Sequence, residues 1–449
     1  MTERQLSLAV NGRERLLRHR LATFEAASAD STVDTVAIVG LGYVGLPTAL
    51  ALHGQCPRII GLDNSPTRLR EIADRTADLG GPDHDRLVAA LADGSLELTA
   101  DPAFLAEADA VIVCVPTPVD GDHLPDLTAL RKACDTVVEH ARPDQTLILT
   151  STSFVGTTRE MLIDPLDARG LRTGSDVFVG FSPERIDPGN PDHVQRDTPR
   201  VVGGATTACG ARVAEVIGRL TDLVYLVSSP EAAEATKLYE NVFRAVNLAL
   251  ANEFADACGA LDLDPVEVTV AAGTKPYGFL GSLPGPGVGG HCIPCDPYYL
   301  LWQLAGKGPG TPLIEQAMRS IHTRPNRVVD RAIDVLAEDD LPATGARVLV
   351  LGVSYKAGVR DLRESSALPL IEGLRAIGAD VAYHDPLVPD VALADGTRLH
   401  SVAAPRGEDW DLVVVHTVHP GSDSSWAADC PRVLDATYQF DTAPHRAVV

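Results

Sequence analysis

Short apolar runs alternate with longer amphipathic stretches from residue 33 to residue 226. The runs are rich in Val, Ile and Leu and are bounded by Gly, Pro and charged residues, which is typical of strands that alternate with helices. We predict strands over residues 36–39, 59–62, 110–115, 147–150, 177–180 and 223–227. This alternation indicates a doubly wound parallel sheet.

Residues 230–258 contain no Pro or Gly after the first position, and Ala and Leu recur there at helical spacing. We therefore predict one long helix, with the glycine at 259 as its stop. A second set of strands follows at 347–352, 380–384, 411–416 and 433–435. The predicted fold class is α/β: two Rossmann-like, doubly wound parallel-sheet domains joined by a long central helix. The predicted divisions are an N-terminal helical extension or partly disordered arm (1–32), a first sheet domain (33–226), a helical middle region (227–336) and a second sheet domain (337–449).

The first predicted strand opens into the pattern G-x-G-x-x-G, formed by Gly40, Gly42 and Gly45. These glycines permit a tight turn, a close approach of a pyrophosphate to the backbone, and packing of the next helix on the sheet. The second strand ends at Asp63, where a carboxylate would bind the ribose 2′-hydroxyl of NAD and repel a 2′-phosphate. Arg68 could contact such a phosphate. The pattern predicts NAD as the cofactor in preference to NADP.

Composition narrows the class of protein. The 449 residues carry 38 Lys and Arg against 61 Asp and Glu, a net charge of -23, which argues against nucleic acid as a partner. No apolar stretch approaches the roughly 18 residues that span a bilayer, and arginines interrupt the leucines of the N-terminal segment. The eight cysteines are scattered, several of them inside predicted strands or helices, as in a reduced cytoplasmic protein.

Cys292 ends a loop of glycines and prolines that runs from residue 283. A thiol in a glycine-cleared loop, in a chain that binds NAD, predicts oxidation of an alcohol or aldehyde to an acid through a covalent thioester. Cys295 makes the pair a C-x-x-C, which also suits a redox disulfide or half of a zinc site. Zinc is disfavoured because no second C-x-x-C or His pair has ligand spacing, so no metal is predicted.

Further polar residues stand where ligands of such proteins bind. Lys237 and Asn241 are four residues apart on the predicted long helix and share one face, so they could stabilise an oxyanion. Glu184 follows a strand end and could act as a general base, and the serine and threonine run 151–153 follows another. Each also has a structural interpretation: a solvated lysine, a surface carboxylate, or turn-forming hydroxyls. The loop from Lys356 to Arg363 supplies positive charge to the second sheet domain, which lacks the three-glycine spacing.

Several linked motifs make the chain similar to the nucleotide-sugar 6-dehydrogenases, a family that acts on UDP-glucose, UDP-N-acetylhexosamines and GDP-mannose. The resemblance spans residues 33–389 and includes VAIVGLGYVGLP, CVPTP, STSFVGTT, FSPERIDPGN, EATKLYENVFRAVN, KPYGF, PGPGVGGHCIPCDPYYL and SYKAGVRDLRESSA. The wording of SPERIDPGN and of the cysteine motif is most similar to bacterial enzymes of UDP-N-acetylhexosamines.

The resemblance implies a two-step, four-electron oxidation of the sugar C6 hydroxyl to a uronic acid. It assigns Cys292 as the nucleophile, a base near Asp296 and Lys237 for the first proton, Lys237 and Asn241 on the C6 oxygen, and Glu184 with Thr152 in thioester hydrolysis. The remaining assignments are Tyr43, Val44, Thr117, Thr152 and Arg363 on the cofactor, and Arg185, Gly289, Gly290 and Lys356 on a UDP-sugar. Dimerisation through the long helix is also implied.

Three positions depart from the family pattern: Leu280-Gly281-Ser282-Leu283 replaces an aromatic pair, Cys295 replaces an aliphatic residue or lysine, and Arg360 stands where an acid is frequent. Three alternatives to the UDP-N-acetylhexosamine hypothesis remain open. They are a UDP-glucose enzyme with the same mechanism, a two-electron dehydrogenase of the hydroxyacid or 6-phosphogluconate type, and an inactive NAD-binding redox sensor.

Overall fold

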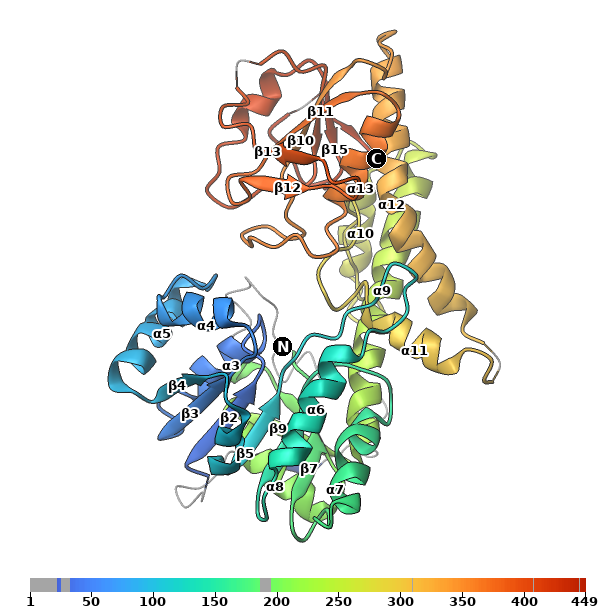
Figure 1. Ribbon diagram of the computed structural model, residues 1–449. Coiled ribbons are helices and arrows are strands. Elements are labelled where there is room, and N and C mark those ends of the chain that lie inside the picture. Colours follow the sequence, from blue (N-terminus) through green and yellow to red (C-terminus); the bar gives the residue numbers. More distant parts are fainter. Residues whose placement is uncertain (1–21, 26–32, 186–194, 309, 407, 444) are drawn as a thin grey trace. The chain divides into compact units, whose positions relative to one another are not determined.

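The computed structural model describes residues 22–25, 33–185, 195–308, 310–406, 408–443 and 445–449 (Figure 1). These residues divide into two compact units, each described by itself below. The first unit holds the described residues up to Glu240 together with Tyr298–Ala305, and the second holds Asn241–Pro297 and the described residues from Gly306 to Val449. The four-part division predicted from the sequence stays a prediction.

A nine-stranded sheet forms the centre of the first unit, with the strand order β1-β9-β8-β7-β6-β5-β2-β3-β4. Its strands are β1 (Ala22–Glu25), β2 (Thr35–Val39), β3 (Arg58–Leu62), β4 (Leu96–Thr99), β5 (Ala110–Val113), β6 (Thr146–Leu149), β7 (Phe178–Phe181), β8 (Arg200–Gly204) and β9 (Leu223–Val227). All neighbours are parallel except β1 with β9 and β7 with β8. The predicted doubly wound α/β sheet is confirmed, with these two antiparallel pairings added.

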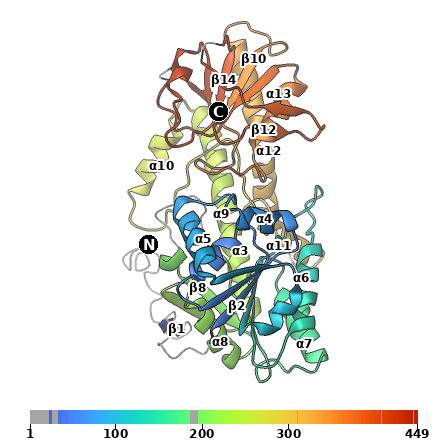
Figure 2. The ribbon, with the colours of Figure 1, turned by 60° about the vertical axis from the view of Figure 1, so that its left-hand side comes forward.

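Helices cover both faces of this sheet (Figures 1 and 2). One apolar core joins the sheet to α3 (Gly45–Leu52), α5 (Gly81–Asp93) and α8 (Thr207–Ile217). The core on the other face joins it to α6 (Thr128–His140), the π-helical turn η2 (Arg159–Ile163), α7 (Asp164–Ala168) and the start of α9 (Pro230–Gly259). The unit also contains α4 (Pro66–Ala73), η1 (Pro102–Glu107) and η3 (Gln195–Asp197).

Two sequence expectations change here. Residues Ala22–Glu25 form strand β1, where a helical extension was predicted, and the rest of residues 1–32 lies outside the described residues. The helix is wrong for these four residues because they add to the sheet edge by pairing antiparallel with Leu223–Leu226 of β9. Strands β4 and β8 were not predicted from the sequence, and β8 ends in two glycines. A Cβ at Gly203 would lie 2.1 Å from the Ser229 carbonyl oxygen, so close packing requires glycine there.

A smaller, five-stranded parallel sheet lies in the second unit, in the order β11-β10-β14-β15-β16. Its strands are β10 (Arg347–Leu351), β11 (Asp380–His384), β14 (Leu412–Val415), β15 (Val433–Asp435) and β16 (Ala447–Val448), and β12 (Asp390–Ala392) pairs with β13 (Arg398–His400) beside it. Helices α12 (Pro312–Ala337) and α13 (Ala367–Ala376) bury one face, whereas tryptophans and η4 (Ser425–Asp429) cover the other.

The long helix α9 runs from Pro230 to Gly259, which confirms the predicted helix to within one residue. It is followed by α10 (Pro265–Gly273), the glycine-rich loop with Cys292, and α11 (Asp296–Leu304). No helix among the described residues is long and apolar enough to cross a membrane.

Candidate active site

The glycine fingerprint joins β2 to α3 and has the geometry that a bound pyrophosphate requires. Gly40 has a φ of 90°, and a Cβ at Gly45 would lie 1.8 Å from the Gly40 carbonyl oxygen, so neither position admits another residue without strain. A Cβ at Gly42 would meet nothing within 4 Å, which leaves open space above the loop. No side chain caps the N-terminus of α3, and its first turn holds no acid. The N–H groups there suit an anion, so these residues fit NAD.

Asp63 follows β3 and reaches this loop. Its Oδ2 accepts the backbone N–H of Leu41 at 2.8 Å and its Oδ1 accepts that of Ser65 at 2.8 Å. Arg68 donates to the Leu41 carbonyl oxygen at 2.8 Å, so its guanidinium lies against the same turn. The exposed Tyr43 and half-buried Val44 belong to the loop, and buried Thr117 lies after β5. The structure thus gathers Asp63 and Arg68 at the fingerprint.

The segments after β6 and β7 lie at neighbouring positions of the sheet, since Leu149 pairs with Phe181. Half-buried Thr152 follows β6, and buried Glu184 follows β7. Glu234 of α9 fixes the loop after Thr152, because its carboxylate accepts the backbone N–H groups of Gly156 at 2.6 Å and Thr158 at 2.8 Å. Burial raises the pKa of Glu234, although these hydrogen bonds oppose the shift. Glu234 was not predicted from the sequence. Its position three residues before Lys237, on the same face of the predicted helix, could have indicated that it points toward the same loops.

Lys237 holds the Glu184 segment, because its Nζ donates to the Glu184 carbonyl oxygen at 2.7 Å. The Glu184 carboxylate accepts the Arg185 backbone N–H at 2.6 Å and a guanidinium N–H of Arg200 at 2.7 Å. Arg200 was not predicted, and an arginine before two valines gives no local signal of such a role. Three sequence-predicted residues, Glu184, Arg185 and Lys237, therefore form one cluster in the first unit.

The thiol of Cys292 is exposed in the second unit, whereas Cys295 is buried. The backbone N–H of Asp296 donates to the Cys292 carbonyl oxygen at 2.8 Å, so the loop turns directly into α11. Asn241 donates from its amide to the buried Asp296 carboxylate. Burial and the nearby Arg363 lower the pKa of His291, which favours the neutral imidazole.

The glycines before Cys292 make room for the loop after β10. A Cβ at Gly289 would lie 2.6 Å from Cβ of Tyr355, and one at Gly290 would lie 2.9 Å from the Tyr355 ring. The Gly290 N–H also donates to the Arg363 carbonyl oxygen at 2.9 Å. We predicted that these glycines clear space for a substrate at the sulfur. The structure gives a different reason for Gly289 and Gly290, which is contact with the loop that contains Lys356.

Two buried polar side chains clamp the start of the cysteine loop at Gly285. Asn252 of α9 accepts the Gly285 N–H at 2.9 Å, and Arg324 of α12 donates to the Gly285 carbonyl oxygen at 3.1 Å. Arg324 is only 2% exposed and pairs with Asp256 at 2.6 Å. Neither Asn252 nor Arg324 was predicted, because their partners are distant in the sequence.

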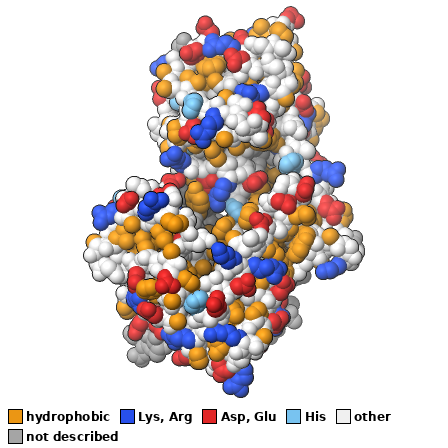
Figure 3. Space-filling model, viewed as in Figure 1, with side chains coloured by type: hydrophobic (Ala, Val, Ile, Leu, Met, Phe, Trp, Pro, Cys, Tyr) orange, Lys and Arg blue, Asp and Glu red, His pale blue; other side chains and the backbone are white. Residues whose placement is uncertain are grey.

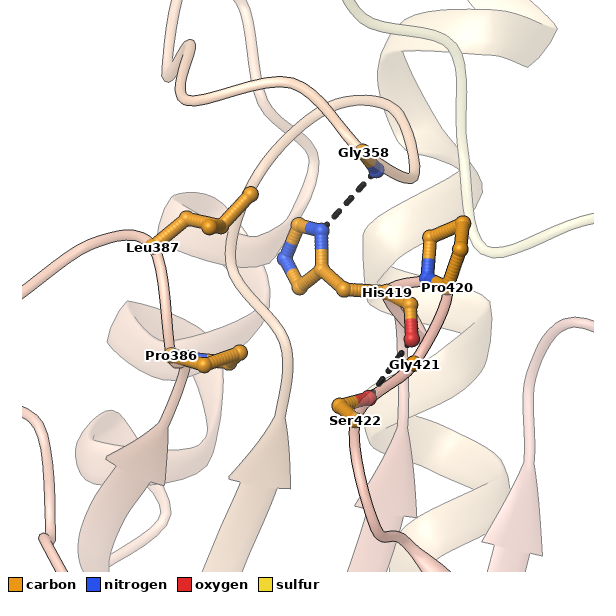
Figure 4. Close-up of a pocket in the computed structure, with 7 residues that line it drawn as sticks. All are labelled: Gly358, Pro386, Leu387, His419, Pro420, Gly421 and Ser422. Atoms are coloured by element: carbon orange, nitrogen blue, oxygen red, sulfur yellow. Dashed lines mark hydrogen bonds between the residues drawn. The ribbon is translucent and has the colours of Figure 1, made fainter.

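The second sheet has an aspartate, Asp385, in a position similar to that of Asp63 in the first sheet, but a histidine side chain lies against its carboxylate. Asp385 follows β11 and accepts the backbone N–H of Val353 at 2.8 Å, as Asp63 does from Leu41. Nε2 of His419 lies 3.1 Å from this carboxylate. Nδ1 of His419 accepts the Gly358 N–H at 3.0 Å (Figure 4). Burial would raise the pKa of Asp385, but hydrogen bonds from His419 and Val353 lower it to about 2. With its acid enclosed, this sheet differs from a dinucleotide site.

A cavity of about 340 Å³ adjoins His419 at this edge, lined by Gly358, Pro386, Leu387, His419, Pro420, Gly421 and Ser422 (Figure 4). In the loop after β10, Lys356 is half-buried, exposed Arg360 follows it, and Arg363 pairs with Asp361 at 2.6 Å. On the face shown in Figure 3, basic side chains are interspersed with acidic ones. Although the net charge of the chain is negative, the loop after β10 therefore carries basic side chains.

A dinucleotide fingerprint on a doubly wound sheet, an acid at the second strand and an exposed cysteine in a rigid loop define an NAD-dependent dehydrogenase. The comparisons specify the family. Models of the UDP-glucose/GDP-mannose dehydrogenase family match residues 34–221 (NAD binding domain), 231–321 (central domain) and 349–445 (UDP binding domain). The chain belongs to this family and catalyses NAD-dependent oxidation of a UDP-sugar.

Protein CapL of Staphylococcus aureus is 38% identical over 78% of this chain and 81% of its own length. The UDP-N-acetyl-D-glucosamine 6-dehydrogenase of Pseudomonas aeruginosa is 32% identical over 86% of this chain and 90% of its length. The solved structure of a UDP-D-ManNAc dehydrogenase from Pyrococcus horikoshii is 29% identical, with a TM-score of 0.83 over 92% of this chain and 98% of that one. The resemblance seen in the sequence is confirmed.

Asp63 tests the cofactor site. The wild type should favour NAD over NADP by at least about tenfold in kcat/KM, equivalent to about 1.4 kcal/mol, because the carboxylate repels a 2′-phosphate. Asp63→Ala should erode this ratio mainly by weakening NAD. Asp63→Asn, which keeps the shape and an acceptor for the loop, should separate charge from loop support. Equal kcat/KM ratios before and after both substitutions would show that Asp63 does not face the ribose.

Proposed function

We propose that this enzyme oxidises C6 of a UDP-N-acetylhexosamine to the uronic acid by two hydride transfers, through a thioester on Cys292. The observation that carries the proposal is the state of the cysteines. Of the eight, all of which the structure describes, only Cys292 is exposed, and its loop is clamped at Gly285 and packed against Tyr355. A two-electron dehydrogenase has no need of an exposed thiol on a rigid loop.

The chemistry begins at the C6 hydroxyl. A base near Asp296 and Lys237 takes its proton while hydride leaves C6, and bound NAD supplies the hydride acceptor. The Cys292 thiolate then bonds to the aldehyde carbon, giving a thiohemiacetal whose oxygen Lys237 and Asn241 stabilise. An ammonium has three donors and an amide nitrogen two, so the bonds to Glu184 and Asp296 leave donors for this oxygen. A second hydride leaves C6, for which a second NAD, bound after the first NADH has left, would supply the acceptor, and the product is a thioester. Water then hydrolyses the thioester with Glu184 and Thr152, and the sulfur leaves as thiolate.

The remaining assignments follow the family motifs. Tyr43, Val44, Thr117, Thr152 and Arg363 contact the cofactor, with the three glycines, Asp63 and Arg68. Arg185, Gly289, Gly290 and Lys356 contact the UDP-sugar. We assign an N-acetylhexosamine because relatives named for UDP-N-acetylglucosamine and UDP-ManNAc share most of this chain's length. Cytoplasmic location is proposed from the cysteines, six of which are buried, as in a reducing compartment.

The protein is also proposed to be a homodimer that forms through α9. The helix exposes Tyr239, Phe243, Leu250 and Phe254, at intervals of four and seven residues, with 42–69% of each side chain accessible. Such intervals place all four on one narrow stripe. Large apolar side chains in a row need a partner surface, and a second copy of the same stripe provides one.

Initial rates with UDP-N-acetylglucosamine, UDP-N-acetylmannosamine and UDP-glucose should be highest for one of the two N-acetylated sugars. With that sugar, two NADH should form per molecule oxidised, because C6 passes from alcohol to acid. Absorbance at the NADH band, set against the uronic acid released, measures this ratio. One NADH per sugar with free aldehyde would contradict the thioester route.

Cys292→Ser should lower turnover at least about 10³-fold, since a serine hydroxyl is a poor nucleophile and a poor leaving group at this step. The matched control is Cys295→Ala, which removes the buried thiol of the same motif and should cost much less. Steady-state rates of both variants measure the difference. An unchanged rate in Cys292→Ser would move the nucleophile to another residue.

Leu250→Asp should convert the dimer to monomers, because a carboxylate in the middle of the stripe would be desolvated without a partner. Light scattering on the purified protein measures the mass. Leu313→Asp is the control, since Leu313 is 68% exposed, against 60% for Leu250, but lies at the start of α12. A Leu250→Asp variant with the wild-type dimer mass would exclude α9 as the contact.

A further inference from the structure

Arg200, the first residue of β8, is an arginine buried to 2% exposure beside the proposed site. Its Nη2 donates to Oε2 of Glu184 at 2.7 Å, and its Nη1 donates to the Pro183 carbonyl oxygen at 3.1 Å. A buried guanidinium is tolerated only when an anion and hydrogen-bond acceptors surround it. Glu184 is that anion, so the two side chains form a buried ion pair.

Hydrogen bonds other than the ion pair also hold Glu184 in place. The Arg185 N–H donates to Oε1 at 2.6 Å, so both carboxylate oxygens have a donor. The backbone is held as well, because Lys237 donates to the Glu184 carbonyl oxygen. The next residue, Arg185, donates from its guanidinium to the Pro199 carbonyl oxygen and to the Glu240 carboxylate. The carboxylate that the proposed function assigns to hydrolysis is therefore fixed at its oxygens and at its backbone.

Basic side chains from three segments surround the Glu184 carboxylate. Arg200 from β8, Lys237 from α9 and Arg185 bring positive charge, whereas Glu240 is itself paired with Arg185. Cys114, at the end of β5, remains a thiol because burial and Glu184 raise its pKa to about 12. Hydrogen bonds between a guanidinium and a carboxylate are strong and directional, so they fix the orientation of the carboxylate.

We propose that Arg200 is a positioning residue that holds the Glu184 carboxylate oriented for hydrolysis of the Cys292 thioester. This inference rests on the proposed function and concerns only its last step. There, Glu184 accepts a proton from water as the water oxygen bonds to the thioester carbon. The carbon–sulfur bond then breaks, and the sulfur leaves as thiolate. Neither hydride transfer involves Glu184, so both should proceed without Arg200.

The test separates these steps by rapid mixing. Wild type, Glu184→Gln, Arg200→Met, Arg200→Lys and the double variant Arg200→Met/Glu184→Gln are mixed with NAD and the UDP-sugar, and NADH is followed through the first turnover and the steady state. Thermal melting establishes which variants are folded. Arg142→Met is the control. Arg142 also donates to a carboxylate, that of Asp109, and to backbone carbonyl oxygens, but Asp109 lies immediately before β5 and is not assigned to the site.

We expect Glu184→Gln to keep a first-turnover burst of two NADH per site and to lose at least about 10²-fold in steady-state turnover, as for loss of a general base. Arg200→Met should keep the same burst and lose roughly tenfold or more, with partial recovery in Arg200→Lys, which retains charge but not the planar fork. The double variant should be no slower than Glu184→Gln, since the two residues act as one unit. Arg200→Met alone leaves a buried carboxylate without its ion-pair partner, whereas the double variant removes both charges. The double variant can therefore be measured even if Arg200→Met does not fold.

Three results would overturn the inference. In the first, a folded Arg200 variant loses the burst and the steady-state rate together, which indicates a general structural role. In the second, Arg200→Met and Arg142→Met have the same turnover while Glu184→Gln is slow, so the base assignment stands and only Arg200 is excluded. In the third, the wild type forms a single NADH per sugar, which removes the thioester route and the hydrolysis step with it.

Discussion

Helix α9 imposes the central constraint on this protein, because its two faces have opposite environments. One face carries polar side chains that make hydrogen bonds to loops or pair with buried groups: Glu234, Lys237, Asn241, Asn252 and Asp256. The opposite face carries the exposed apolar stripe. Unpaired polar groups inside a protein are costly, so each inward side chain must find its partner in one register. A rotation of the helix would break all of these hydrogen bonds and ion pairs together.

Two glycine loops illustrate how one residue type serves different constraints. At the fingerprint, Gly40 and Gly45 are required by contacts within the loop itself, and Gly42 leaves space open for a ligand. In the cysteine loop, Gly289 and Gly290 are required by Tyr355 and Glu364, which are more than sixty residues away. The first set therefore belongs to a local motif, whereas the second couples the nucleophile to the loop that carries Lys356.

The positions of the buried arginines in this acidic protein are explained by their carboxylate partners. An acidic chain buries two arginines to 2% exposure, and each is matched by a carboxylate: Arg200 by Glu184 and Arg324 by Asp256. Both also donate to backbone carbonyl oxygens of segments assigned to the site. Buried ion pairs of this kind add little to stability relative to apolar packing, but breaking one is costly. Their effect here is to fix loop positions.

The sequence by itself determined most strands, the long helix, the cofactor fingerprint and the family, because periodicity, turn residues and short motifs act over a few neighbouring positions. It also named Cys292, Glu184, Lys237 and Asn241, although their roles remain proposals. Only the tertiary structure decided that β1, β4 and β8 join the sheet, since strand pairing depends on an edge supplied by distant residues. The same holds for Glu234, Arg200, Asn252 and Arg324. A buried polar side chain is defined by its partner, and no local pattern in a chain specifies which distant group that partner will be.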